Sequence, residues 1–175
     1  DWYGAAINDY APQMQHDLSA SGGGEKVKYF MSLGYLEQEG FWKTKDLNYD
    51  KFTLRSNITA QLTDNLEAEL LVSTMSDQKD QPYTDAWEVF KGVYMQFPHF
   101  PLYANDNPDY LQSVPDLNNP LAVTNKDIGG FKKIENRFTT ATLALNYQIP
   151  GVEGLKARLM HNREYRTNKR AEFRK

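Results

Sequence analysis

The 175-residue sequence predicts an all-β protein: an antiparallel up-and-down meander of about six strands with one long, partly helical loop. Several segments alternate apolar and polar side chains with the period of two that is typical of strands. Short turns rich in Gly, Pro and Asn join some of these segments, and long connections join the others. Six of the eight prolines fall between Gln78 and Lys133, where they exclude a regular strand ladder.

The clearest alternation lies between residues 52 and 63. Phe52, Leu54 and Ile58 fall on one predicted face of this strand, and polar residues occupy the positions between them. A tight Asp64-Asn65 turn then leads into a return strand of the same character. The same reasoning predicts strands at about residues 14–21, 26–37, 52–63, 66–76, 136–149 and 155–165.

The predicted long loop spans about residues 78–133 and contains one helix, from Asp85 to Phe97. Its apolar stripe is predicted from aromatic residues at helical spacing: Trp87, Phe90, Tyr94 and Phe97. Asp85 together with Glu88 resembles a capping box. Because loops of this size are uncommon in compact domains and usually functional, we expect this one to carry a binding function.

Composition excludes several classes of protein. The net charge of -3 lacks the basic excess of nucleic-acid-binding proteins, so no nucleic acid partner is expected. The chain has no cysteine, which excludes disulfides, thiolate metal sites and a catalytic thiol. His16, His99 and His161 lack metal-ligand spacing, so neither a metal nor a cofactor is predicted. No apolar run suits a membrane helix, yet the mean hydropathy of -0.70 is compatible with a transmembrane barrel.

The turn lengths predict that the meander is part of a larger transmembrane β-barrel. Successive turns of a meander lie at opposite edges, so the short turns share one edge and the long connections, at about residues 38–51 and 78–133, share the other. Bacterial outer-membrane barrels have this asymmetry, and Tyr29 and Tyr35 sit where interfacial girdle residues belong. Because such barrels need at least about eight strands, the strands predicted here form only part of one.

Particular motifs resemble a family. The segment from Ala11 to Gly40 is similar to the early-barrel segment of SusC/RagA-type TonB-dependent transporters of Bacteroidetes, with Asp17 where Asn is more usual. The resemblance is strong over about residues 10–77, moderate over 134–160 and weak in the long loop. It rests on His16-Asp17-Leu18-Ser19, Gly22-Gly23, Tyr29-Phe30, Ser32, Gly34-Tyr35, Gln38-Glu39-Gly40, Asn48-Tyr49, Arg55-Ser56-Asn57, Asp64-Asn65-Leu66 and the turn from Pro150 to Leu155.

The resemblance implies a location in the outer membrane and the import of glycans or peptides, without an enzymatic step. It implies a barrel of about 22 strands with an N-terminal plug that is absent from these residues. It also implies that TonB supplies energy through that absent N-terminal region, and that a SusD-like surface lipoprotein lids the extracellular face.

Candidate cargo-binding residues lie in the long loop, where aromatic rings can stack on sugars and polar side chains can supply hydrogen bonds. They are Trp87, Phe90, Tyr94, Phe97, Tyr103, Asp106 and Asn107. For most of the aromatic residues we favour the alternative of a small core that stiffens the loop, with one or two of them touching cargo. Asn105 to Asp109 is rich in oxygen ligands but lacks the spacing of a calcium loop, which favours a turn.

Two further groups of charges have competing interpretations. Glu67 and Glu69 offer two carboxylates, as glycoside hydrolysis requires, but neighbours on a polar strand face are more often charges that line a barrel lumen. A basic run near the end of the sequence suits lipid headgroups or lipopolysaccharide phosphates, although a solvated strand end is the more common role. Its members are Arg163, Arg166, Lys169, Arg170, Arg174 and Lys175.

The alternative function is a soluble extracellular β-domain that binds carbohydrate, with the apolar strand faces forming a sandwich core. Periodicity alone does not separate the two functions, because both place one strand face away from water. The number of strands and the one-sided long loops favour the barrel. As an isolated piece, the chain is expected to self-associate through its apolar face and two unpaired strand edges.

Overall fold

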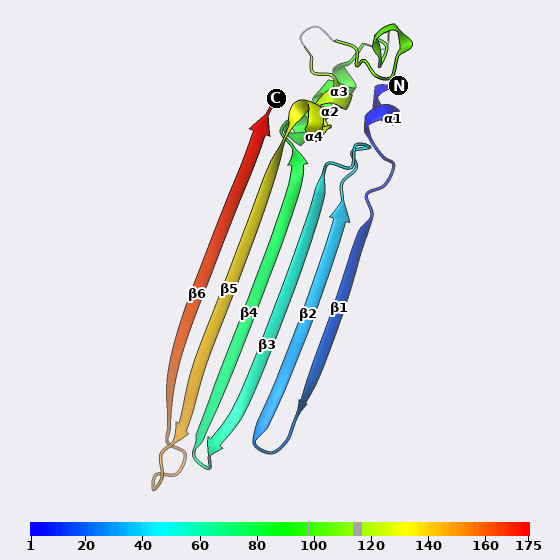
Figure 1. Cartoon of the computed structure of the whole chain (residues 1–175). Helices are drawn as coiled ribbons and strands as arrows, with labels where there is room; N and C mark the ends of the chain where they lie inside the picture. The colour runs from blue at the N-terminus through cyan, green and yellow to red at the C-terminus, as the bar shows by residue number, and fades with distance from the viewer. Residues whose placement is uncertain (98, 114–116) are drawn as a thin grey trace.

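The computed structural model describes residues 1–97, 99–113 and 117–175, and one six-stranded antiparallel sheet dominates it. Consecutive strands are hydrogen-bonded neighbours in the order β1-β2-β3-β4-β5-β6 (Figure 1). The predicted all-β meander is therefore confirmed. The strands are β1 (Gln13–Gly23), β2 (Val27–Glu39), β3 (Asn48–Thr63), β4 (Leu66–Pro82), β5 (Gly130–Gln148) and β6 (Lys156–Arg174).

The long connections are shorter than the sequence predicted. β4 and β5 stay paired as far as Pro82 and Phe131, which confines the loop to residues 83–129 instead of about 78–133. Polar residues such as Gln78 and Glu135 face each other there, so hydrophobic alternation disappears while backbone pairing continues. Pro82 is tolerated as the final residue of its strand. The β2–β3 connection likewise covers residues 40–47 rather than about 38–51, and Pro98 and Pro115 lie outside the described residues.

All three tight turns lie at one edge of the sheet, and the long connections lie at the other (Figure 1). In the β1–β2 turn, the Gly24 N–H donates to the Val27 carbonyl at 2.8 Å. The β5–β6 turn needs glycine, because Gly151 and Gly154 have φ angles of 88° and 81°. One end of the sheet therefore carries only tight turns, and the other end carries all the long connections.

Strand register gathers the apolar side chains on one face of the sheet, here called the apolar face. Ile58 pairs with Leu70, and Leu70 pairs with Leu143, and directly paired residues of antiparallel strands point to the same face. Leu70 and Leu143 are 40% and 46% exposed. The described residues form no second sheet, so they do not build the sandwich core of the alternative function. No helix in the described ranges has the length and apolar character needed to cross a membrane.

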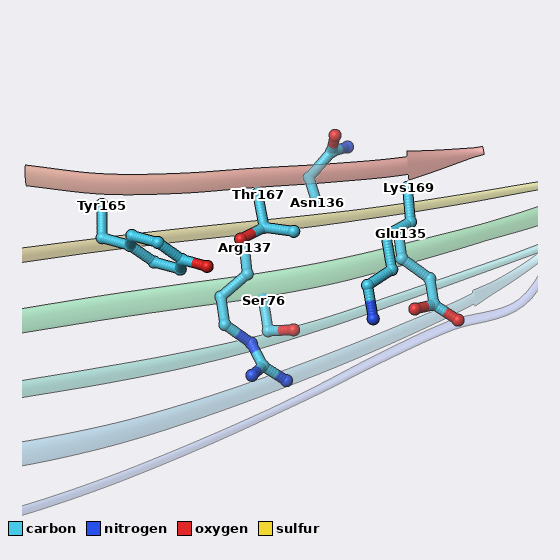
Figure 2. A pocket seen from close by; sticks show the side chains of 7 residues that line it. All are labelled: Ser76, Glu135, Asn136, Arg137, Tyr165, Thr167 and Lys169. Carbon is cyan, nitrogen blue, oxygen red and sulfur yellow. The ribbon is translucent and has the colours of Figure 1, made fainter.

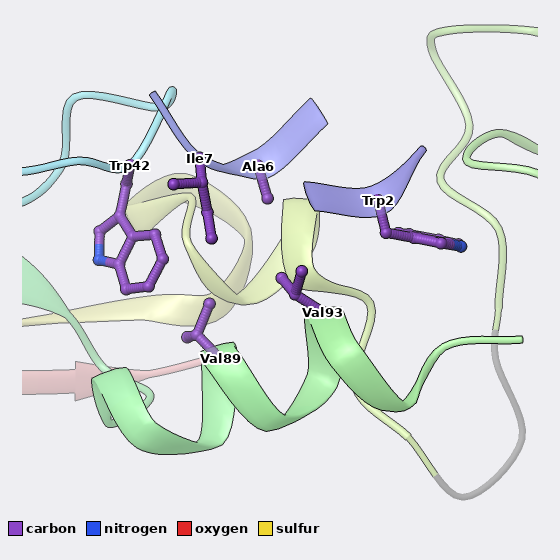
Figure 3. Packing of buried hydrophobic residues seen from close by; sticks show 6 residues of the cluster. All are labelled: Trp2, Ala6, Ile7, Trp42, Val89 and Val93. Atoms are coloured by element: carbon purple, nitrogen blue, oxygen red, sulfur yellow. The ribbon is translucent and has the colours of Figure 1, made fainter. Parts of the chain in front are cut away.

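The buried core lies beyond the sheet, at the edge that carries the long connections. It joins α1 (Trp2–Ala6), the β2–β3 connection and α2 (Ala86–Met95), and Trp42 and Val89 are 1% and 0% exposed within it. We call residues 1–12, 40–47 and 83–129 the loop cap; they also contain η1 (Ala104–Asp106), α3 (Pro120–Val123) and α4 (Lys126–Gly129). The core residues, drawn in Figure 3, are Trp2, Ala6, Ile7, Trp42, Val89 and Val93.

The helix α2 begins at its predicted cap but buries a different side. Asp85 Oδ1 accepts a hydrogen bond from the Trp87 N–H at 2.9 Å, whereas Glu88 pairs with Lys91 at 2.8 Å instead of completing a capping box.

The predicted aromatic stripe is confirmed only at Phe90, which packs against the core, whereas Tyr94 and Phe97 are exposed. Val89 and Val93 point into the loop cap, whereas Trp87 is exposed. Gly92 lies on the same buried side, where a Cβ would be in ordinary van der Waals contact with the Asn118 carbonyl oxygen at 3.4 Å. The valine and glycine side of the helix is therefore the buried side, and Phe90 packs at its border.

Candidate functional site

The face opposite the apolar face, here called the polar face, carries connected hydrogen-bonding side chains from three neighbouring strands. Asn146 Nδ2 on β5 donates to Glu69 Oε1 at 2.7 Å and to Glu67 Oε1 at 3.1 Å on β4. Arg158 on β6 donates to the second oxygen of Glu69 at 3.3 Å. Both glutamates lie on the same strand and accept hydrogen bonds from the same amide group. Glycoside hydrolysis instead needs two carboxyl groups on opposite sides of the substrate. Glu67 and Glu69 are therefore part of the hydrophilic surface of the polar face.

Amide and carboxylate groups continue along the polar face toward the loop cap. Asn136 Nδ2 donates to Asp77 Oδ2 at 2.9 Å, and Asn168 donates in turn to the Asn136 side-chain oxygen. The guanidinium carbon of Arg166 lies 5.5 Å from the ring centroid of Phe138. These groups alternate along the strands with positions on the apolar face. The polar character therefore extends over most of the length of the sheet.

Two shallow pockets hollow the polar face. The first, of about 290 Å³, spans β1 to β3, and its polar lining consists of Asp17, Ser19, Ser32, Thr53 and Arg55. Gly34 makes room there, because a Cβ at this position would lie 2.8 Å from Asp17 Oδ1. The second, of about 430 Å³, lies near the tight turns, where its polar lining includes Gln61, Glu67, Asn146, Lys156 and Arg158. Mixed donors and acceptors of this kind suit solutes rich in hydroxyl or amide groups.

The structure does not gather the predicted loop residues into one site. Trp87, Tyr94 and Phe97 are 70%, 72% and 56% exposed, so their rings are available to a ligand. Tyr94 lies near Tyr3 of α1, with 6.2 Å between ring centroids. These three residues form the exposed aromatic part of the loop cap.

Phe90, by contrast, packs inside the loop cap. Its ring centroid lies 5.3 Å from that of Phe41 and 5.3 Å from that of Trp42. Sequence reasoning missed Trp42 and Trp2 as core residues, because both lie far from the long loop along the chain. The sequence signal that was available is the neighbouring pair Phe41 and Trp42 within an otherwise polar connection.

The Asn105–Asp109 segment is a turn, as its composition favours. Asn105 and Asp106 have φ angles of 53° and 55°, and the Asn107 side-chain oxygen accepts from the Asp109 N–H at 3.0 Å. Asp106 is exposed, and Tyr103 is half-buried and bridges to Leu111. Within the described ranges, no group of three or more His, Asp or Glu side chains is placed to hold a metal ion.

An ion pair that sequence reasoning missed fastens the two long connections together. Lys126 Nζ lies 3.2 Å from Asp46 Oδ1, and the Lys126 N–H donates to Asp46 Oδ2 at 3.0 Å. Hydrogen bonding to Asp46, followed by its charge, raises the pKa of Lys126 above the ordinary value of 10.5. Nearby, Thr44 Oγ1 donates to the Thr124 carbonyl at 2.7 Å. The paired residues are 80 positions apart, so no local motif indicates them.

Comparisons with known proteins agree with this architecture, although no family model matches the chain. Over 73 residues, or 42% of the chain, it is 36% identical to TonB-dependent receptor P26 of Formosa agariphila and covers 7% of that protein. A longer match of 119 residues, or 63% of the chain, is 27% identical to TonB-dependent receptor P3 of the same organism and covers 12% of it. The chain thus spans a small part of the length of these relatives.

A solved structure shares the fold of the whole chain. The match is to a chain of the RagAB peptide importer in its closed-closed state, with a TM-score of 0.69 and 18% sequence identity. It covers 100% of this chain and 20% of the importer chain, so the sheet and its connections recur within a much longer polypeptide. Together, the sequence matches and the shared fold confirm the predicted resemblance of this chain to SusC/RagA-type TonB-dependent transporters.

Proposed function

We propose that this chain forms part of the wall of an outer-membrane barrel that imports nutrients, with its apolar face toward lipid and its polar face toward the passage. The observation that carries the proposal is the separation of the two faces by strand register. Leu70 and Leu143 pair on one face, and Glu69 and Asn146 are hydrogen-bonded on the other. In hydrocarbon, backbone groups must be paired within the protein, and continuous strand pairing meets this need. Further barrel strands would pair with the edges at β1 and β6.

The length of the apolar stretch supports this placement. On β2, every residue of the apolar face from Val27 to Tyr35 has an apolar or aromatic side chain. The length of this stretch is close to the roughly 9–11 residues that a tilted strand needs to cross hydrocarbon. On β5 the same face becomes polar toward the loop cap, with Arg137 and Glu135. Because long loops of bacterial barrels are extracellular, we propose that the loop cap lies outside the cell.

The proposed activity is transport without an enzymatic step, metal or cofactor. TonB acts through a plug and N-terminal region outside these residues, and a SusD-like lipoprotein lids the extracellular face. The cargo is a glycan or peptide, because both combine hydrogen-bonding groups with surfaces that stack on aromatic rings. Trp87, Tyr94 and Phe97 offer such rings at the entrance, and the polar face offers hydrogen bonds beyond it.

Cysteine accessibility in the full-length protein tests the placement. Leu159 and Met160 are neighbours on β6, are 68% and 61% exposed, and lie on opposite faces. After reconstitution in lipid, a charged maleimide is expected to label Met160→Cys and to spare Leu159→Cys, because the reagent does not enter hydrocarbon. In detergent-free urea both variants should react. Equal labelling of the two cysteines in lipid would contradict the proposed orientation.

A growth experiment tests the cargo. A strain that lacks the full-length gene is expected to lose growth on one glycan or peptide of a panel, and the restored gene should recover it. Substituting Trp87→Ala in the restored gene should weaken that recovery at limiting cargo, because its ring is exposed in the loop cap. Unchanged growth of the deletion strain on every glycan and peptide would argue against nutrient import.

A further inference from the structure

A basic pocket lies on the apolar face of β5 and β6, between the level of Ala141 and the loop cap. It has a volume of about 180 Å³. Ser76 pairs with Arg137, Arg137 with Thr167, and Glu135 with Lys169, so these residues continue the face that carries Leu143. Figure 2 shows their side chains on one side of the sheet. The lining residues are Ser76, Glu135, Asn136, Arg137, Tyr165, Thr167 and Lys169, of which Asn136 points to the other side.

The pocket carries an excess of positive charge. Its one carboxylate is paired, because Glu135 Oε1 lies 3.1 Å from Lys133 Nζ. Arg137 and Lys169, in contrast, take part in none of the ion pairs formed within the described part of the chain. The hydroxyl groups of Tyr165 and its neighbours add hydrogen-bond donors. Unpaired cations beside hydroxyl donors suit an anion with several acceptor oxygens.

Strand geometry divides the basic run near the end of the sequence into two groups. Lys169 stands directly opposite Glu135 on the apolar face, whereas Arg166 lies over Phe138 on the polar face. Arg170 also belongs to the polar face, where it is adjacent to Glu172 at 3.0 Å. Only part of the basic run therefore adjoins the apolar surface.

We propose that this pocket binds the phosphate-bearing headgroup of an outer-leaflet lipid whose acyl chains lie along the apolar face. This inference rests on the proposed membrane placement. Ala141 is the last aliphatic residue of β5 on this face, and Arg137 follows two positions beyond Thr139. A guanidinium binds phosphate through paired hydrogen bonds, and an ammonium adds a point charge. A lipid satisfies both the cations and the adjoining apolar surface, whereas a free anion satisfies only the cations.

The dimensions are compatible with one phosphate group. A volume of about 180 Å³ equals the space of about six water molecules at about 30 Å³ each. The lining residues come from β4, β5 and the edge strand β6, so a further strand paired with β6 would extend the pocket. Tyr165 stands at the border of the pocket nearest the tight turns, and the proposed placement assigns it to the aromatic girdle of the barrel.

The test uses the full-length protein in non-ionic detergent and bis-phosphorylated lipid A as the probe, with binding measured by native mass spectrometry. The double variant Arg137→Gln/Lys169→Gln is expected to bind about thirtyfold more weakly, because each cation near an anionic lipid headgroup contributes a factor of about five. The matched control is Arg166→Gln/Arg170→Gln, which removes two charges from the same region of the polar face and should leave binding unchanged. Dephosphorylated lipid A should bind the unaltered protein about as weakly as intact lipid A binds the double variant.

Each contrary result overturns the inference. It fails if the pocket variant binds normally, if the control variant loses as much affinity, or if inorganic phosphate competes as well as the lipid does. Heat-modifiable migration on gels checks that the variants fold. If the double variant does not fold, Lys169→Gln alone should still weaken binding about fivefold. Outer-membrane fractionation of the unaltered protein separates the two proposals: a protein absent from that membrane refutes the placement, and a protein present there without lipid binding refutes only the pocket.

Discussion

The substitution Leu70→Arg tests whether the apolar face contacts lipid, and the adjacent residue provides its control. Leu70 lies in the middle of the apolar stretch, between Ile58 on β3 and Leu143 on β5. Leu71 lies on the polar face, opposite Asn57. Both leucines are 40% exposed, so the same substitution alters equally exposed positions on the two faces.

The two substitutions differ in cost only if one face contacts hydrocarbon. An arginine near the membrane midplane destabilises a barrel by about 2–4 kcal/mol. An arginine in place of Leu71 faces water, where surface substitutions change stability by about 0.5 kcal/mol or less. We therefore expect Leu70→Arg to lower the free energy of unfolding by about 2–3 kcal/mol more than Leu71→Arg does.

The assay is urea-driven unfolding of the full-length protein in lipid vesicles, followed by heat-modifiable electrophoretic migration. The slope of the transition indicates whether both variants expose the same surface on unfolding. Free energies of unfolding that agree within about 0.5 kcal/mol for the two variants would refute lipid contact of the apolar face.

Phe90→Ala is expected to destabilise the loop cap by about 3 kcal/mol, detected as faster proteolysis, because its ring packs on two aromatic neighbours. Trp87→Ala should leave the proteolysis rate nearly unchanged, because this ring is 70% exposed; equal rates for the two variants would contradict the assigned sides of α2. The raised pKa of Lys126 implies that its ion pair with Asp46 persists up to the ordinary value of 10.5 and is lost as pH rises through the higher folded value. In the unaltered protein, proteolysis of the loop cap should therefore become faster as pH rises above 10.5. In Lys126→Met, which lacks this ion pair at every pH, the increase should be smaller. Finally, the isolated 175-residue chain is expected to form oligomers by light scattering, and a monomer stable on dilution would count against an exposed apolar face.

The meander was predictable from the sequence because its signals are local. Alternation along one strand and the tight Asp64-Asn65 turn specify a hairpin without reference to distant residues. The ends of the strands were not predictable in this way. From Ser76 to Gln81 every residue of β4 is polar, so the side-chain pattern no longer indicates the backbone pairing that continues there.

The interior of the loop cap was not predictable because it joins residues that are distant in sequence. Helical spacing allows α2 to bury either its aromatic side or its valine side. The choice depends on Trp42 and on the segment that contacts Gly92, neither of which belongs to the helix. Of the predicted binding residues, Phe90 consequently lies inside the loop cap and Trp87 on its surface.

The boundary of the apolar face is slanted relative to strand register, and this slant favours strands that cross a membrane at an angle. Toward the loop cap, the last leucine on this face is Leu33 on β2 and Leu159 on β6. Strand pairing places Leu159 at the same height along the sheet as Val27 on β2. The paired residues between them are Leu145, Ala68 and Ala60. From residue 33 to residue 27 the boundary moves about 20 Å along the strands, while four strand spacings cover about 19 Å. The resulting slant of about 45° matches the strand tilt of roughly 35–45° in transmembrane barrels. The same slant lowers the boundary at β5 and β6, so that Arg137 and Lys169 lie on its loop-cap side.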